Sequence, residues 1–127
     1  MTSRKKLFII DDDPAMIKLL KLTFSYSDYE IHEARVAEGA LRRIKVVLPD
    51  TILLDVMIPG EINGLQLCEE IKGDPELNRT RVILLSARGQ KEDLALGGKC
   101  GADAYIVKPF SPMGLLETIK NSMRCEY

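Results

Sequence analysis

The sequence of 127 residues contains no tryptophan, a single histidine and only three cysteines, and its formal net charge is −1. A charge so close to zero gives no electrostatic basis for binding nucleic acid or an anionic membrane, and we expect neither. The three cysteines lie far apart and form no C-x-x-C pair, which fits a disulfide framework poorly. We therefore expect reduced thiols and a cytoplasmic protein.

Long apolar runs are also missing. The first run, Leu7–Ile10, is four residues long and ends at three aspartates. The apolar region of a signal peptide needs about 7–15 residues, so we expect no signal peptide here. No stretch approaches the ~20 apolar residues of a membrane-spanning helix. The length predicts a single domain, residues 1–127, with one ordinary hydrophobic core.

Short apolar runs alternate along the chain with segments of helical periodicity, which is typical of β-α units around a parallel sheet. The expected strands are Lys6–Ile10, Tyr29–Ala34, Thr51–Leu54, Val82–Leu85 and Ala104–Val107. The expected helices are one opened by Asp13 and Pro14, then Ala37–Val47, Leu65–Ile71, Gln90–Cys100 and one opened by Ser111 and Pro112. We expect a flavodoxin-like, doubly wound α/β fold with five helices and a five-stranded parallel sheet in the order 2-1-3-4-5.

Four of the expected strands end in polar residues suited to phosphoryl chemistry. The first strand is followed by Asp11, Asp12 and Asp13, the third by Asp55, the fourth by Ser86 and the fifth by Lys108. Each residue alone has an ordinary structural explanation, and Asp13 is expected to be only a helix N-cap. Because the carboxyl ends of parallel strands share one edge, where ligands bind, the set as a whole predicts one pocket.

The expected pocket combines carboxylates with an ammonium group. In the predicted strand order the first and third strands are neighbours, so Asp11 and Asp12 would lie beside Asp55. Adjacent carboxylates repel one another unless a cation neutralises them. A hard divalent cation, Mg²⁺ or Mn²⁺, takes oxygen ligands of this kind, and Lys108 adds a further positive charge. The pattern predicts a metal site that presents one carboxylate to a phosphoryl group.

These motifs resemble the receiver domain of bacterial two-component response regulators, including its single-domain members. The resemblance covers nearly all of residues 5–124. It is carried by Ile10–Pro14, Leu54–Pro59 with Gly64, Leu85–Ala87, Gly101–Tyr105 and Lys108–Phe110.

The resemblance implies a role for each residue of the pocket. Asp55 would accept a phosphoryl group from a histidine kinase or a phosphotransfer protein. Mg²⁺ would be held by Asp11, Asp12, Asp55 and the backbone carbonyl of Met57. Lys108 would pair with Asp55 and then with the phosphoryl oxygens. Ser86 would hydrogen-bond the phosphoryl group, and Ser86 and Tyr105 would form the switch. The family is a phosphoacceptor rather than an enzyme, with weak autophosphatase activity at most.

The resemblance also implies an output face formed by Gln90–Cys100, the last strand and the last helix, which would act on an effector that the sequence does not name. Within that face, the Gly97-Gly98 pair predicts either a helix that is easily remodelled or an ordinary surface helix whose sequence is under little constraint. The spacing from Asp55 to Gly64 is one residue longer than the spacing that is commonest in the resembled family, so we expect a bulged loop. Met57 and Arg88 occupy the two variable positions at which the family tunes dephosphorylation. The apolar Met57 offers no group to orient an attacking water, which predicts a long-lived phosphoryl group.

Other functions fit the sequence less well. An aspartate-nucleophile phosphohydrolase would carry D-x-D after the first strand, whereas the candidate nucleophile Asp55 follows the third. A flavin-binding protein of this topology would need a loop that cradles phosphate, and three aspartates repel phosphate. A receiver that binds partners without phosphorylation is disfavoured because acceptor, acid pair, hydroxyl and lysine are all present. His32 lies in an expected edge strand and is expected to be structural or exposed.

Overall fold

The computed structural model describes residues 5–25, 29–86, 101–108 and 110–124. Its strands are β1 (Lys5–Ile10), β2 (Tyr29–Ala34), β3 (Thr51–Asp55), β4 (Arg81–Ser86) and β5 (Ala104–Val107). All are parallel, in the order β2-β1-β3-β4-β5. The predicted flavodoxin-like sheet order is confirmed, and each strand boundary lies within about one residue of its prediction.

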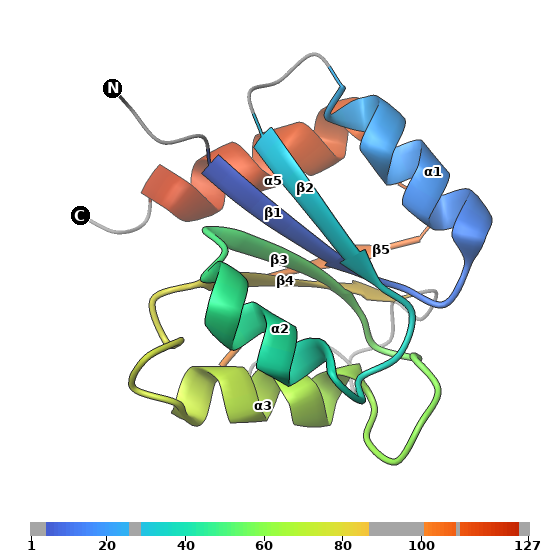
Figure 1. Cartoon of the computed structure of the whole chain (residues 1–127). Coiled ribbons are helices and arrows are strands. Elements are labelled where there is room, and N and C mark those ends of the chain that lie inside the picture. The colour runs from blue at the N-terminus through green and yellow to red at the C-terminus, as the bar shows by residue number, and fades with distance from the viewer. Residues whose placement is uncertain (1–4, 26–28, 87–100, 109, 125–127) are drawn as a thin grey trace.

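Helices cover both faces of the sheet (Figure 1). Helices α1 (Pro14–Thr23) and α5 (Pro112–Arg124) lie on one face, and α2 (Ala40–Val47) and α3 (Gly64–Gly73) lie on the other. Five helices were predicted and four are present in the described part of the chain. The remaining one, predicted at Gln90–Cys100, lies outside the described residues. Within the described ranges, every helix is too short or too polar to cross a membrane.

The hydrophobic core has two layers because successive residues of a strand point to opposite faces of the sheet. In β1, Leu7 and Ile9 pack with α1 and α5, whereas Phe8 and Ile10 pack with α2 and α3. Every residue of β3 and β4 is buried, as expected for parallel strands covered on both faces. Every residue of β2 is half-buried, and β2 lies at the edge of the sheet, which confirms the expected edge position.

The helix starts follow local capping rules, with one correction. Asp13 caps α1 as predicted, and its carboxylate accepts a hydrogen bond from the amide of Ala15 at 2.9 Å. The predicted start of the second helix at Ala37 is wrong, since α2 begins at Ala40. Gly39 has a φ of +79°, and a helix requires negative φ. Ala37 is instead buried in the core from the preceding turn.

Candidate functional site

The strand register brings the predicted site residues to one level of the sheet. Ile10 pairs with Leu54, and Asp55 pairs with Leu85. Asp11 therefore leaves β1 next to the end of β3. Ser86 pairs with Val107, so Lys108 follows directly at the end of β5. Segments that are far apart in the sequence thus meet at the carboxyl edge, as the sequence predicts.

Three carboxylates gather at this edge. One carboxylate oxygen from each of Asp11, Asp12 and Asp55 can be chosen so that all three lie within 4.8 Å of one another. Asp11 is fully buried and Asp55 is only 6% exposed, whereas Asp12 is open to solvent. The group is therefore reached from outside on the side of Asp12.

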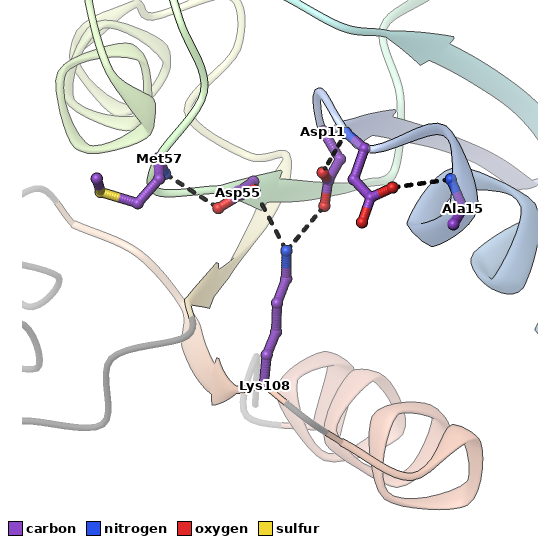
Figure 2. Close-up of polar contacts among 6 residues, drawn as sticks. Asp11, Ala15, Asp55, Met57 and Lys108 are labelled. Atoms are coloured by element: carbon purple, nitrogen blue, oxygen red, sulfur yellow. Dashed lines mark hydrogen bonds and ion pairs between the residues drawn. The ribbon is translucent and has the colours of Figure 1, made fainter.

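Lys108 places its ammonium group between two of these carboxylates (Figure 2). Its Nζ lies 3.0 Å from Oδ2 of Asp11 and 3.2 Å from Oδ2 of Asp55. The resemblance implies that Lys108 pairs with Asp55 and then with the phosphoryl oxygens. The structure shows the pair with Asp55 and adds Asp11 as a second partner of the same ammonium group. The backbone amide of Lys108 donates to the carbonyl of Ser86 at 2.7 Å, which fixes the start of this side chain beside β4.

The second oxygen of each buried carboxylate is held by a backbone amide. Oδ1 of Asp11 accepts from the amide of Asp13 at 2.9 Å, and Oδ1 of Asp55 accepts from the amide of Met57 at 3.0 Å. Each carboxylate thus has one oxygen fixed by the main chain and one facing Lys108. The Met57 side chain extends away from the site and the residue is 54% exposed.

The charges at the site are incompletely balanced. Burial raises the pKa of Asp11, and the neighbouring negative charge of Asp55 adds to this rise, although the Asp13 amide and Lys108 oppose it. Burial lowers the pKa of Lys108, but its pairs with Asp11 and Asp55 outweigh burial, so that pKa lies above its ordinary value. Lys108 therefore stays charged, and the carboxylates outnumber it.

The other predicted residues fall close by or outside the described ranges. Ser86 is buried at the end of β4. Tyr105, in β5, is half-buried against the core layer of α2 and α3. The prediction for Arg88, and that for the Gly97-Gly98 pair, lie outside the described residues.

His32 has a partner that the sequence prediction did not find. Its Nε2 lies 2.7 Å from Oε2 of Glu30, and its ring stacks on Phe8 with a centroid separation of 6.1 Å. The two residues i and i+2 share one face of β2, a spacing that a search at helical intervals overlooks.

The donor set fits a divalent cation. Three carboxylates and one ammonium carry a net charge of −2 when ionised, which equals the charge that Mg²⁺ would neutralise. Asp11, Asp12 and Asp55 offer only oxygen ligands, and hard cations of this size prefer oxygen. The pKa of Asp11 is raised mainly by burial, and the negative charge of Asp55 adds to the rise, which agrees with a site where negative charge is in surplus.

The comparison with known proteins agrees with the fold. The family model for the response regulator receiver domain matches residues 7–120. The chain is 34% identical over 119 residues to the phosphate regulon transcriptional regulatory protein PhoB of Rhizobium meliloti (strain 1021), covering 94% of the chain and 52% of that protein. It is 32% identical over 120 residues to the alkaline phosphatase synthesis transcriptional regulatory protein PhoP of Bacillus subtilis (strain 168), covering 94% and 49%.

Solved structures show the same similarity. A CheY-like response regulator receiver domain protein from Methanospirillum hungatei JF-1 superposes with a TM-score of 0.86 at 30% identity, covering 96% of this chain and 95% of that one. Fold and site together define a phosphoacceptor domain of two-component signalling. The chain belongs to the response regulator receiver domain family.

The chain spans about half the length of the curated relatives it matches. A further relative, of which the chain covers 52%, is named DNA-binding response regulator MtrA, from Mycolicibacterium smegmatis (strain ATCC 700084 / mc(2)155). That name describes the whole relative. The sequence-based expectation of no nucleic-acid binding concerns residues 1–127 alone.

Proposed function

We propose that this chain accepts a phosphoryl group on Asp55 from the phosphohistidine of a histidine kinase or a phosphotransfer protein. One observation carries the proposal. The carboxylate of Asp55 sits almost buried at the end of β3, 3.2 Å from the Lys108 ammonium and beside two further carboxylates. A buried carboxylate with a fixed cation on one side is a poised nucleophile rather than a surface acid.

The chemistry asks for positioning and charge neutralisation more than for proton transfer. An oxygen of Asp55 forms the new P–O bond while the P–N bond of the phosphohistidine breaks, and the imidazole nitrogen keeps the electron pair. The Met57 amide orients the Asp55 carboxylate. Lys108 balances negative charge on the acceptor and on the incoming phosphoryl oxygens.

Mg²⁺, or Mn²⁺, is the proposed cofactor. Asp11, Asp12, Asp55 and the backbone carbonyl of Met57 would hold the ion, in agreement with the net charge of the site. When bound, it supplies the positive charge that lets a phosphoryl group approach three carboxylates.

Phosphorylation would act as a switch. A phosphoryl group on Asp55 adds about two negative charges and new acceptor oxygens. The Ser86 hydroxyl and the Lys108 ammonium would turn toward these oxygens, and Tyr105 would move with Ser86. The proposed output face comprises β5, α5 and the predicted helix at Gln90–Cys100, and it would act on an effector.

The test is the intact mass of the purified chain after incubation with acetyl phosphate and Mg²⁺. We expect one phosphoryl group on the parent chain and none on Asp55→Asn. Incorporation by Asp55→Asn at the parent level would overturn the assignment of the acceptor. Absence of incorporation by the parent would favour a receiver that binds partners without phosphorylation.

The phosphoryl group is expected to be long-lived. The exposed, apolar Met57 side chain gives no group to orient water for hydrolysis, so autophosphatase activity should be weak. Decay of the phosphorylated mass after removal of acetyl phosphate measures the lifetime. Decay within seconds would contradict this expectation.

A further inference from the structure

The loop between β3 and α3, residues 56–63, begins directly after Asp55 and carries Met57. Its base is closed by a hydrogen bond of 2.9 Å from the amide of Gly64 to the carbonyl of Val56. Gly64 packs so closely on the backbone of Asp55 that any side chain at position 64 would collide with the Asp55 carbonyl oxygen. The loop is therefore fixed at both of its ends.

The tip of this loop is fixed by a residue from a different loop. Oε1 of Glu38, between β2 and α2, accepts a hydrogen bond of 2.8 Å from the backbone amide of Glu61. Gly60 has a φ of +120°, and a Cβ added there would lie 2.5 Å from both carboxylate oxygens of Glu38. The main chain at positions 60 and 61 thus lies close against one carboxylate, and the positive φ at position 60 favours glycine there.

The same two loops also pack through their apolar side chains. Ile58 from the loop after β3 and Ala37 from the loop after β2 are both nearly fully buried, and they belong to one core cluster. Glu38 follows Ala37 directly, so the polar contact continues the apolar one out to the surface. The hydrogen bond from the Glu61 amide holds the pKa of Glu38 below its ordinary value, as expected for a carboxylate that accepts this bond in its ionised form.

The sequence gives a reason why this loop needs an additional contact. The resemblance to the receiver family implies that the spacing from Asp55 to Gly64 is one residue longer than the spacing commonest in that family. A longer loop has more conformations to lose when its tip is fixed. In this loop Gly60 has a positive φ, and the Glu38 carboxylate lies against it.

We infer that Glu38 is a positioning residue, which holds the tip of loop 56–63 and thereby fixes Met57 for Mg²⁺ binding beside Asp55. The inference rests on the proposed function, because the Met57 carbonyl is a proposed ligand of the ion. Mg²⁺ demands near-octahedral geometry, so a ligand on a loosened loop binds it less well. The amide of Met57, which holds Oδ1 of Asp55, belongs to the same loop and would loosen with it.

The experiment is Mg²⁺ titration by calorimetry on four chains, namely the parent, Glu38→Ala, Glu38→Gln and Glu61→Gln. Glu38→Ala removes the acceptor and should weaken Mg²⁺ binding about tenfold, at the lower end of effects for residues that orient metal ligands. Glu38→Gln keeps an acceptor oxygen and should stay within about twofold of the parent. Glu61→Gln is the matched control, because it removes an equal charge from the residue that Glu38 contacts and keeps the backbone amide that donates.

The control separates positioning from simple charge attraction. If Glu38→Gln and Glu61→Gln weaken Mg²⁺ binding as much as Glu38→Ala does, the effect is electrostatic and the inference is overturned. Hydrogen exchange of the Glu61 amide without Mg²⁺ gives a second readout, and it should be faster in Glu38→Ala only.

Failure of the inference and failure of the proposed function give different results. If the Glu61 amide exchanges faster in Glu38→Ala while Mg²⁺ affinity is unchanged, the positioning role is refuted and the phosphoacceptor proposal is untouched. If the parent chain binds no Mg²⁺ and takes up no phosphoryl group, the proposed function fails and the inference falls with it.

Discussion

The two ends of the sheet both hold aspartates next to a lysine, but they treat the negative charge differently. At the amino end, Oδ2 of Asp103 accepts from the amide of Val82 at 2.8 Å and pairs with Nζ of Lys72 at 2.7 Å. Lys72 also donates to the carbonyl of Thr80 at 2.7 Å. This lysine connects the end of α3 to the starts of β4 and β5, and one carboxylate meets one ammonium.

The carboxyl end has the opposite balance. There, Asp11, Asp12 and Asp55 share the single ammonium of Lys108. The pKa of Asp11 is raised by burial and by Asp55, so its ionised form costs folding free energy. The amino end thus uses charge for stability, and the carboxyl end keeps a surplus that a ligand can neutralise.

The largest expected effect comes from disrupting the backbone of the carboxyl end. Gly64→Ala would force a side chain against the Asp55 carbonyl oxygen and the Val56 Cα, neither of which can rotate away. We expect a loss of about 2–4 kcal/mol of unfolding free energy, measured by urea denaturation.

The matched control lies in the same helix, α3, near the amino end of the sheet. Nothing lies within 4 Å of a Cβ added at Gly73, so Gly73→Ala should be neutral or slightly stabilising. Equal losses for Gly64→Ala and Gly73→Ala would show that the close approach at Gly64 is unimportant.

A smaller effect of opposite sign is expected from Asp11→Asn. The asparagine side chain can still accept the hydrogen bond from the backbone amide of Asp13. The substitution removes one negative charge from the surplus at the carboxyl end. At pH 7 and without Mg²⁺ we expect a gain of about 1–2 kcal/mol in unfolding free energy, seen as a higher Tm. A loss of stability at pH 7 would show that the Asp11 charge is fully compensated by Lys108.

The pH dependence of this gain follows from the direction of the Asp11 pKa shift. The folded state binds the proton of Asp11 more tightly than the unfolded state, whose pKa is near 3.8. Stability from that proton is therefore complete below pH 3.8 and is lost as pH rises through the raised folded-state pKa. The stability advantage of Asp11→Asn over the parent should accordingly shrink on acidification and vanish below pH 3.8. The difference in Tm between the two chains, followed against pH, measures this advantage.

The smallest effect is expected from the same substitution at the other end. Asp103→Asn keeps an acceptor for the Val82 amide but loses the charge that pairs with Lys72. We expect a loss of about 0.5–1 kcal/mol at pH 7, because the pair is partly exposed to solvent. An equal gain from Asp11→Asn and Asp103→Asn would remove the contrast between the two ends.

The fold could be predicted from the sequence because its determinants are local. Buried strands are continuous apolar runs, and Asp13 followed by Pro14 is a helix start that short-range rules identify. The start of α2 could not be predicted this way. Its helical periodicity extends back to Ala37, and only the backbone conformation of Gly39 shows where the helix begins.

The site could be predicted to a lesser depth. Asp11, Asp55 and Lys108 each follow the end of a predicted strand. Because the carboxyl ends of parallel strands lie at one edge of the sheet, the sequence is enough to place the three residues together. The contacts of Glu38 with Glu61 and of Lys72 with Asp103 join residues 23 and 31 positions apart. No periodicity links such pairs, because loop conformation and side-chain reach decide them.

The most direct test of a charge surplus at the carboxyl end is the stabilisation of the folded chain by Mg²⁺. Thermal unfolding would be followed with and without Mg²⁺ for the parent, Asp11→Asn and Asp103→Asn. At a Mg²⁺ concentration about a hundred times its Kd, the parent and Asp103→Asn should each gain roughly 2.7 kcal/mol. Asp11→Asn should lose most of that gain. An unchanged gain in Asp11→Asn, or none in the parent, would contradict a divalent-cation site at Asp11, Asp12 and Asp55.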